Sequence, residues 1–221
     1  CDWILSLDAK VTVEVGNHDL PYYNLIERFF DPYRRIRRIE RLVEREIDLP
    51  GLSLVPLNTT ARAQARFNWS RGIVSDKALV STLNHIRSVP PGRRILVTAH
   101  HPLREFDRKG RQLTTHGEHA LAELAKAGVY AVLSGHVHDP FDLIHDTPHG
   151  PIRMIGAGTL SARVRSTPPS FNEIRFDGHT LAVHVRTLEA VPTREMLIED
   201  VPPNAEPPEP GDPVAPIALE E

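Results

Sequence analysis

Cysteine is almost absent from this sequence, since Cys1 is the only one in 221 residues, and an internal disulfide is therefore excluded. A reducing compartment is compatible with this composition, and we expect the cytoplasm. No apolar run approaches the roughly 20 residues that cross a bilayer, so the sequence predicts no membrane partner. Neither sign of charge dominates, because the formal net charge is -3, and this gives no strong signal for nucleic-acid binding.

The sequence also lacks a methionine at its start. It begins Cys1-Asp2-Trp3, and residues 3–9 have the composition of a helix end. We therefore expect the chain to begin inside a longer reading frame, so that the lack of a signal peptide carries no information. Residues 192–221 are rich in proline and acidic side chains, and a disordered tail is predicted there, after one domain over residues 1–191.

Hydrophobic periodicity predicts strands and helices in alternation up to about residue 140 and mainly strands after it. The predicted helices span 76–87, capped by Ser75, and 117–127, closed by Gly128. The predicted strands span 11–15, 52–57, 95–99 and 129–134, followed by two hairpins within 141–158 and 171–188. This order favours an α/β fold. Residues 34–46 are predicted as either a helix or an irregular basic segment whose arginines face solvent.

Metal-binding types of side chain follow three of the predicted strands directly. These segments are Gly16-Asn17-His18-Asp19, His100-His101-Pro102 and Gly135-His136-Val137-His138. In layered α/β proteins, ligands gather outside the carboxyl ends of strands, so these side chains are expected in one pocket. Imidazole nitrogens and an amide oxygen suit zinc, iron or manganese. Glycine at 16 and 135 is expected to permit sharp turns with positive φ.

Any one of these segments alone is more often an ordinary polar strand end than a metal site. All three, in order, resemble the "GNHD", "HHP" and "GHVH" motifs of the calcineurin-like metallophosphoesterase family, over roughly residues 3–190. The resemblance is nearest to the bacterial phosphodiesterase-like branch. It implies a four-layer sandwich of two mixed β-sheets flanked by helices, which here lacks its N-terminal strands.

The resemblance also implies a reaction and roles for individual residues. The metal ligands that it implies are Asn17, His100, His136 and His138. His18 would act on the substrate phosphate or the leaving oxygen, and Asp19 would orient His18. His101 would lie behind the ligands or be structural. The implied activity is hydrolysis of a small phosphate ester, such as a phosphodiester, at a dinuclear centre of iron, manganese or zinc, where a metal-bound hydroxide attacks phosphorus.

Two carboxylate motifs of the family, Asp-x-His and Gly-Asp-x-x-Asp, are missing before Gly16. Asp8 is a poor substitute for the bridging carboxylate. Neutral ligands leave two dications repelling each other, so we expect this chain to bind at most one metal weakly and to hydrolyse little. Two alternatives stay open, which are a non-catalytic relative that serves as a binding or scaffold module and a hydrolase with one metal. The missing strands also predict unpaired edges beside the strand at 11–15, and hence poor solubility.

Overall fold

A computed structural model describes residues 2–21, 24–43, 47, 49–61, 70–105, 109–161 and 167–188. All of these residues belong to one compact unit, Cys1–Glu189. The tail predicted at 192–221 lies outside the described residues. Within the part of the chain that is described, no helix has the length and apolar character needed to cross a bilayer.

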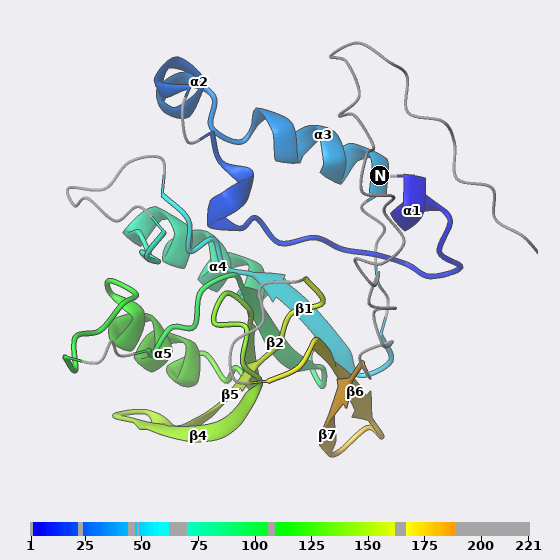
Figure 1. Cartoon of the computed structure of the whole chain (residues 1–221). Helices are drawn as coiled ribbons and strands as arrows, with labels where there is room; N and C mark the ends of the chain where they lie inside the picture. The colour runs from blue at the N-terminus through cyan, green and yellow to red at the C-terminus, as the bar shows by residue number, and fades with distance from the viewer. Residues whose placement is uncertain are drawn as a thin grey trace, which may run out of the picture. The chain divides into compact units, whose positions relative to one another are not determined.

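Five strands form a mixed sheet in the order β1-β2-β3-β5-β4 (Figure 1). The strands are β1 (Leu52–Pro56), β2 (Arg94–Ala99), β3 (Ala131–Ser134), β4 (Phe141–Thr147) and β5 (Gly150–Gly156). The first three and β5 run parallel, while β4 pairs with β5 in the antiparallel direction. The carboxyl ends of β1, β2, β3 and β5 therefore meet at one edge of the sheet, where ligands gather in such folds.

Two amphipathic helices cover one face of this sheet (Figure 1). Helix α4 (Asp76–Ser88) begins at Ser75, whose side chain accepts a hydrogen bond from the amide of Ala78. Helix α5 (Gly117–Lys126) ends before Gly128, which has a φ of +79°. Both helices, their caps and their core faces are confirmed. Their buried leucines and isoleucine pack against the strand residues that face the same way, namely Val55, Val97, Val132, Ile152 and Met154.

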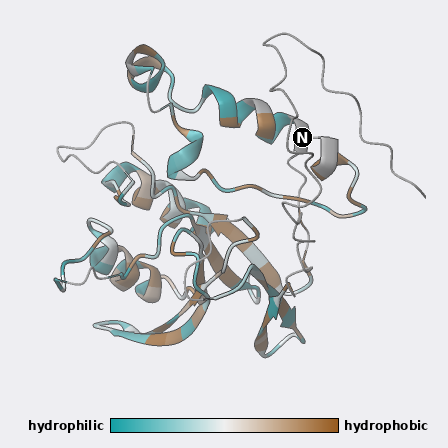
Figure 2. Cartoon of the chain, in the orientation of Figure 1, coloured by the Kyte–Doolittle hydropathy of each residue, from teal (hydrophilic) through white to brown (hydrophobic). Residues whose placement is uncertain are grey.

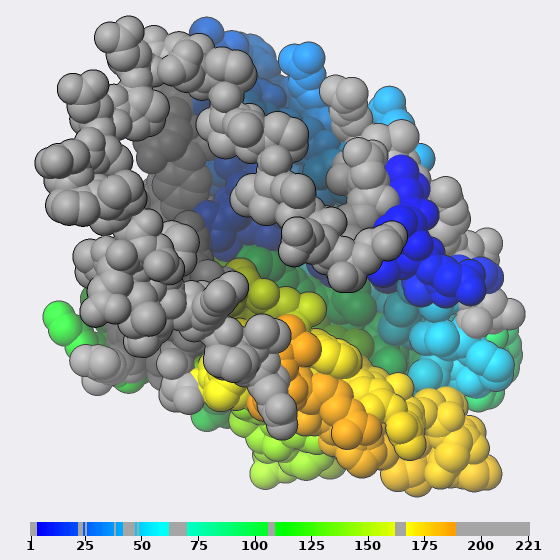
Figure 3. Space-filling view, turned by 45° about the vertical axis from the view of Figure 1, so that its right-hand side comes forward, coloured from blue at the N-terminus to red at the C-terminus, as the bar shows by residue number. Residues whose placement is uncertain are grey.

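The opposite face of the sheet is covered in part by an antiparallel hairpin of β6 (Ser170–Phe176) and β7 (Leu181–Thr187). Leu181 packs there against Leu96, Ala131 and Ile155, each of which directly neighbours a residue of the helix-covered face. This alternation is the period-2 pattern of a sheet buried on both sides. The hairpin, drawn in yellow and orange in Figure 3, reaches the surface of the molecule.

The strand predicted at 11–15 is wrong. Val11 forms a single β-bridge, and residues 12–15 have no regular structure. All four of these residues line a cavity of about 800 Å³, together with Leu54, Pro56 and Thr98. Alternation predicts an extended segment that is buried on one side, but a strand also needs a backbone partner, and β1 pairs only with β2 among the described strands. Unpaired strand edges were expected beside residues 11–15. That expectation does not apply, because this segment is not a strand.

The N-terminal helices are α1 (Asp2–Leu5), α2 (Leu25–Phe30) and α3 (Arg34–Val43), with a 3₁₀ turn, η1 (Asn17–Asp19), between the first two. Of the two alternatives for residues 34–46, the helix is observed over the residues of α3. Its Ile36 is buried, while Arg34, Arg35 and Arg37 face solvent, in keeping with its largely hydrophilic colouring in Figure 2.

The predicted α/β class is thus confirmed in its coarse form. The described residues contain a mixed five-stranded sheet, a second antiparallel sheet and flanking helices. The more detailed four-layer sandwich is taken up below as part of a proposal.

Candidate metal centre

Two neighbouring parallel strands, β2 and β3, carry histidines just past their carboxyl ends. Their register pairs Ala99 with Ser134, so that the following residues leave the sheet side by side. The amide of Gly135 then donates a hydrogen bond to the carbonyl oxygen of His100 at 3.1 Å, which fixes one loop against the other. The sheet itself therefore holds His100 and His136 together, although they are 36 positions apart in the sequence.

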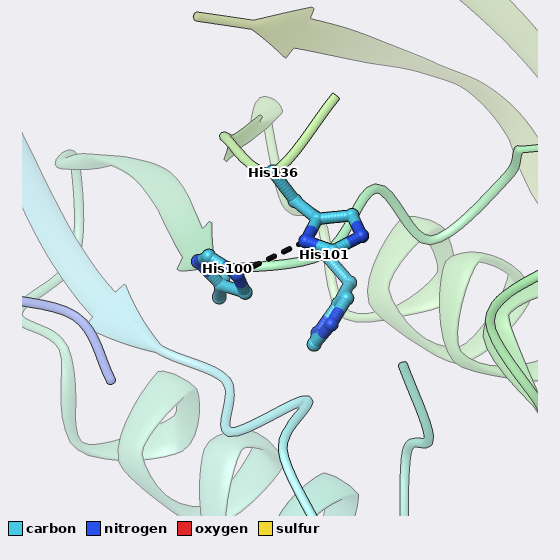
Figure 4. Close-up of side chains that lie close together, drawn as sticks. All are labelled: His100, His101 and His136. Carbon is cyan, nitrogen blue, oxygen red and sulfur yellow. Dashed lines mark hydrogen bonds between the residues drawn. The ribbon is translucent and has the colours of Figure 1, made fainter. Parts of the chain in front are cut away.

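Three atoms able to bind a metal converge at this point. Nε2 of His100 lies 2.8 Å from Oδ1 of Asn17 and 3.2 Å from Nδ1 of His136. Figure 4 shows the rings of His100 and His136 turned toward each other, with the second contact dashed. Two ligand atoms bound to one zinc ion at about 2.1 Å and at the tetrahedral angle would lie about 3.4 Å apart. The observed separations of 2.8 and 3.2 Å are shorter, so the side chains would move apart slightly to hold a shared cation.

In the turn that carries Asn17, the backbone of Gly16 lies close to the ring of His100. Oδ2 of Asp19 accepts a hydrogen bond from the amide of Gly16 at 2.7 Å, and this closes the 3₁₀ turn. A β-carbon on Gly16 would lie 2.9 Å from Cε1 and 3.1 Å from Nδ1 of His100. The glycine is needed here for space and not for its dihedral angle, because its φ is -94°.

Positive φ angles occur in the loop after β3, at residues other than the one predicted. His136 has a φ of 68° and His138 a φ of 64°, while Gly135 is not among the residues with positive φ. The expectation of positive φ at Gly16 and Gly135 is therefore wrong. Left-handed backbone at a non-glycine residue is strained, and such residues cluster at functional sites. The strain reorients the imidazoles at i and i+2, which an extended backbone would direct to the same face.

A third imidazole, that of His101, lies beside the first two. Ring nitrogens of His100, His101 and His136 all lie within 4.8 Å of one another, so this group could hold a metal ion. His101 differs from the others because it is only 1% exposed and both of its ring nitrogens have partners. Nδ1 lies 2.9 Å from Oγ1 of Thr59, and Nε2 lies 2.9 Å from the carbonyl oxygen of Ser70.

Burial keeps the imidazoles of His100 and His101 neutral. It lowers the pKa of His100 to about 4, with smaller contributions from the charges of His18 and His138. Burial likewise lowers the pKa of His101 to about 3, and the charges of His136 and His100 add to the effect. A neutral imidazole is the form that binds metal, so His100 is in that form across the neutral pH range.

The predicted site residues have different outcomes. Asn17 and His136 each contact His100. His18 is exposed and His138 is half-buried, and both lie near enough for their charges to act on His100. The side chain of Asp19 holds the turn through the amide of Gly16. The predicted roles of His18, Asp19 and His138 in catalysis or metal binding remain predictions.

The converging group is neutral throughout. Among the described residues, the group that could hold a metal contains histidines and no carboxylate. The amide nitrogen Nδ2 of Asn17 is buried and has no hydrogen-bond partner in the described part of the chain. Amide oxygen and imidazole nitrogens are suitable ligands for one divalent ion, while two closely spaced dications would need negative charge between them.

Thr59 and Ser70 were missed in the sequence, where residues 58–72 have the polar composition of a loop. The signal that could have found Thr59 is its place after β1, at the same edge of the sheet as the histidines. Ser70 contributes only a backbone carbonyl, which no side-chain pattern reveals. Comparisons with known proteins add no further residues, since no protein family matches the chain and no curated protein is detectably similar to it.

Proposed function

We propose that this chain belongs to a metal-dependent phosphoester hydrolase of the calcineurin-like metallophosphoesterase type, with small phosphodiesters as its substrates. One observation carries the proposal, which is the convergence of Oδ1 of Asn17 and Nδ1 of His136 on Nε2 of His100 at the carboxyl edge of the sheet. The helix-covered sheet and the hairpin would then be layers of that family's sandwich.

Each residue has a proposed part in the chemistry. Asn17, His100 and His136 would hold the one divalent ion expected here, and His138 would take the place of a ligand of the second metal of the family's dinuclear centre. A bound divalent ion supplies Lewis-acid polarisation of a phosphoryl oxygen and an acidified water. His18 is exposed beside these ligands, where it can donate a proton or a hydrogen bond to the phosphate ester. Asp19 keeps its turn closed and so fixes the position of His18.

A second candidate, a non-catalytic binding module, is favoured by the neutrality of the site. The described residues that converge there include no carboxylate, so they offer nothing to offset the charge of two cations. A module that binds one cation and no substrate would have this composition. The two candidates differ in the step after metal binding, because only the hydrolase converts an ester.

The test is metal titration combined with a chromogenic substrate. Zn²⁺ or Mn²⁺ is titrated into the metal-free protein, and hydrolysis of bis(4-nitrophenyl) phosphate is followed at each metal concentration. We expect binding of one ion and slow, metal-dependent hydrolysis. Replacing Asn17 or His136 by alanine removes a proposed ligand and should weaken metal binding by at least the roughly 10-fold to 100-fold that follows from losing a ligand's hydrogen-bonded support.

The matched control is His149→Ala, which removes an exposed imidazole from the turn between β4 and β5. This variant should bind metal and hydrolyse substrate as the unaltered protein does. Metal binding without any hydrolysis would support the binding module instead. Equal metal affinity in the Asn17, His136 and His149 variants would refute the site itself.

A further inference from the structure

We propose that His101 is a positioning residue and not a metal ligand. Its ring, locked by Thr59 and Ser70, forms a rigid wall that fixes the metal-binding rings of His100 and His136. This inference rests on the metal centre proposed above and goes further, because proximity alone groups all three histidines as possible ligands.

The hydrogen bonds of His101 define its tautomer. A carbonyl oxygen can only accept, so the contact with Ser70 places the ring proton on Nε2. Nδ1 therefore carries the lone pair and accepts a hydrogen bond from the hydroxyl of Thr59. Both ring nitrogens are engaged, and neither has a lone pair to offer a cation. The Nε2 of His100 also contacts a carbonyl-type oxygen, that of Asn17, but Asn17 and His136 are themselves groups that bind metal. A cation placed between them would replace that contact with bonds to all three side chains, whereas at His101 it would break the buried bonds to Thr59 and Ser70.

Thr59 holds His101 at two points. Its hydroxyl donates to Nδ1 of the ring and also accepts a hydrogen bond from the backbone amide of His101 at 3.0 Å. Thr59 is 1% exposed, so water does not compete with either bond. The same hydroxyl thus ties the ring and the backbone of His101 to the segment that follows β1, and the ring cannot rotate without breaking a buried bond.

Packing closes the other sides of the ring. A β-carbon on Gly72 would lie 2.8 Å from both Cβ and Cγ of His101, so the backbone of residue 72 presses directly on it. The next residue along the chain, Pro102, is held by the buried hydroxyl of Thr114, which donates to its carbonyl oxygen at 2.7 Å. His101 is thus enclosed by segments from three separate parts of the sequence.

The locked ring is in contact with both metal-binding rings. Its centroid lies 4.6 Å from that of His100, edge to face at 87°, and 4.4 Å from that of His136, at 51°. Figure 4 shows His101 lying beside the pair. Since side chains that support ligands tune metal affinity through ring orientation, a loosened His101 should leave His100 and His136 less well aligned.

The test alters Thr59 and leaves every metal ligand in place. Thr59→Val keeps the side-chain shape and removes the hydroxyl, while Thr59→Ser keeps the hydroxyl. Thr82→Val is the matched control, because Thr82 is also buried and its hydroxyl also makes a hydrogen bond, donated to the carbonyl oxygen of Pro56, away from the histidines. For each variant, Zn²⁺ affinity is measured by competition with a chelator, the ring nitrogens of the ¹⁵N-labelled histidines by NMR, and stability by urea denaturation.

We expect Thr59→Val to weaken Zn²⁺ binding roughly tenfold. Thr59→Ser should restore the affinity, and Thr82→Val should lose stability without losing affinity. In the unaltered protein, Zn²⁺ should shift the nitrogen signals of His100 and His136, while His101 keeps its proton on Nε2. This set of results would separate a positioning role from a merely structural one.

Two results would overturn the inference while leaving the metal centre intact. One is coordination of Zn²⁺ by a ring nitrogen of His101, and the other is equal loss of affinity in the Thr59→Val and Thr82→Val variants. No Zn²⁺ binding by the unaltered protein would overturn the metal centre and the positioning role together. Zn²⁺ binding without ester hydrolysis would count only against the proposed function.

Discussion

On one face of the five-stranded sheet, α4 and α5 bury a continuous core in which Leu121 and Leu124 are fully buried. On the other face, the β6–β7 hairpin covers only a part, and residues 12–15 border a cavity of about 800 Å³. The first face has the close packing of a finished protein interior. Among the described residues, a packed layer covers only part of the second face, and the side chains outside that part make fewer dispersion contacts.

The candidate metal centre lies where these two regions meet. His100 and His136 are fixed by the ends of β2 and β3, whose pairing belongs to the well-packed sheet. Asn17 comes from the segment that borders the cavity, and its contact with His100 bridges 83 positions of sequence. The candidate site therefore combines two side chains, His100 and His136, that the packed sheet holds in place. The position of the third, Asn17, depends on the segment beside the cavity.

The largest expected effect is a difference in core truncation between the two faces. Leu121→Ala removes a fully buried side chain from the helix-covered face and should lower the free energy of unfolding by about 3 kcal/mol. Leu54→Ala alters a half-buried residue that already borders the cavity, and should cost only about 1 kcal/mol. Urea denaturation of the two variants measures both values.

Equal losses of unfolding free energy in the two leucine variants would contradict the difference between the faces, because they would mean that both faces are packed alike. Val80→Ala, at an exposed position of α4, serves as the baseline. Its unfolding free energy should differ from that of the unaltered protein by less than about 0.5 kcal/mol.

Acidification should lower the free energy of unfolding through His101, which lies at the edge of the sheet where the two faces meet. The folded pKa of His101, about 3, lies below the ordinary value of 6.5, so on acidification the unfolded chain takes up a proton that the folded chain does not. The stability due to neutral His101 is present above pH 6.5 and is lost as the pH falls toward 3. The slope approaches about 1.4 kcal/mol per pH unit for one such group.

Urea denaturation at several pH values between about 6.5 and about 4.5 measures this slope, and His101→Gln provides the comparison. Glutamine does not titrate, so the variant should lose stability less steeply than the unaltered protein as the pH falls. His100, whose pKa is lowered to about 4, contributes to the slope in both proteins. Identical slopes would contradict a neutral, buried His101.

The smallest expected effect distinguishes two glycines beside the site. Gly16→Ala places a β-carbon 2.9 Å from the ring of His100 and should weaken Zn²⁺ binding about fivefold, or about 1 kcal/mol. At Gly135 the nearest atom to a β-carbon is the carbonyl oxygen of His100, at 3.9 Å, which is an ordinary contact. Gly135→Ala should therefore bind Zn²⁺ with nearly unchanged affinity. The reverse order would show that the loop after β3, and not the turn at Asn17, is the tighter side.

Local pattern predicted much of the well-packed region. The helices at 76–87 and 117–127 and the buried strands were evident because their apolar spacing, caps and closing glycine act over a few residues. The same reasoning failed at 11–15, where alternation was present and a partner strand was not. Periodicity reports which side chains prefer burial, while strand formation depends on a backbone neighbour that is distant in the sequence.

The sequence by itself determined which metal-binding types of side chain are present and their places after strand ends, because those features are local to each segment. Only the tertiary structure showed the hydrogen bonds that engage both ring nitrogens of His101. His101 is bonded by Thr59, 42 positions away, and by Ser70, 31 positions away, whereas His100 faces Asn17 and His136. The physical reason is that an imidazole lone pair is either used in a hydrogen bond or free to coordinate, and its partners come from folded neighbours.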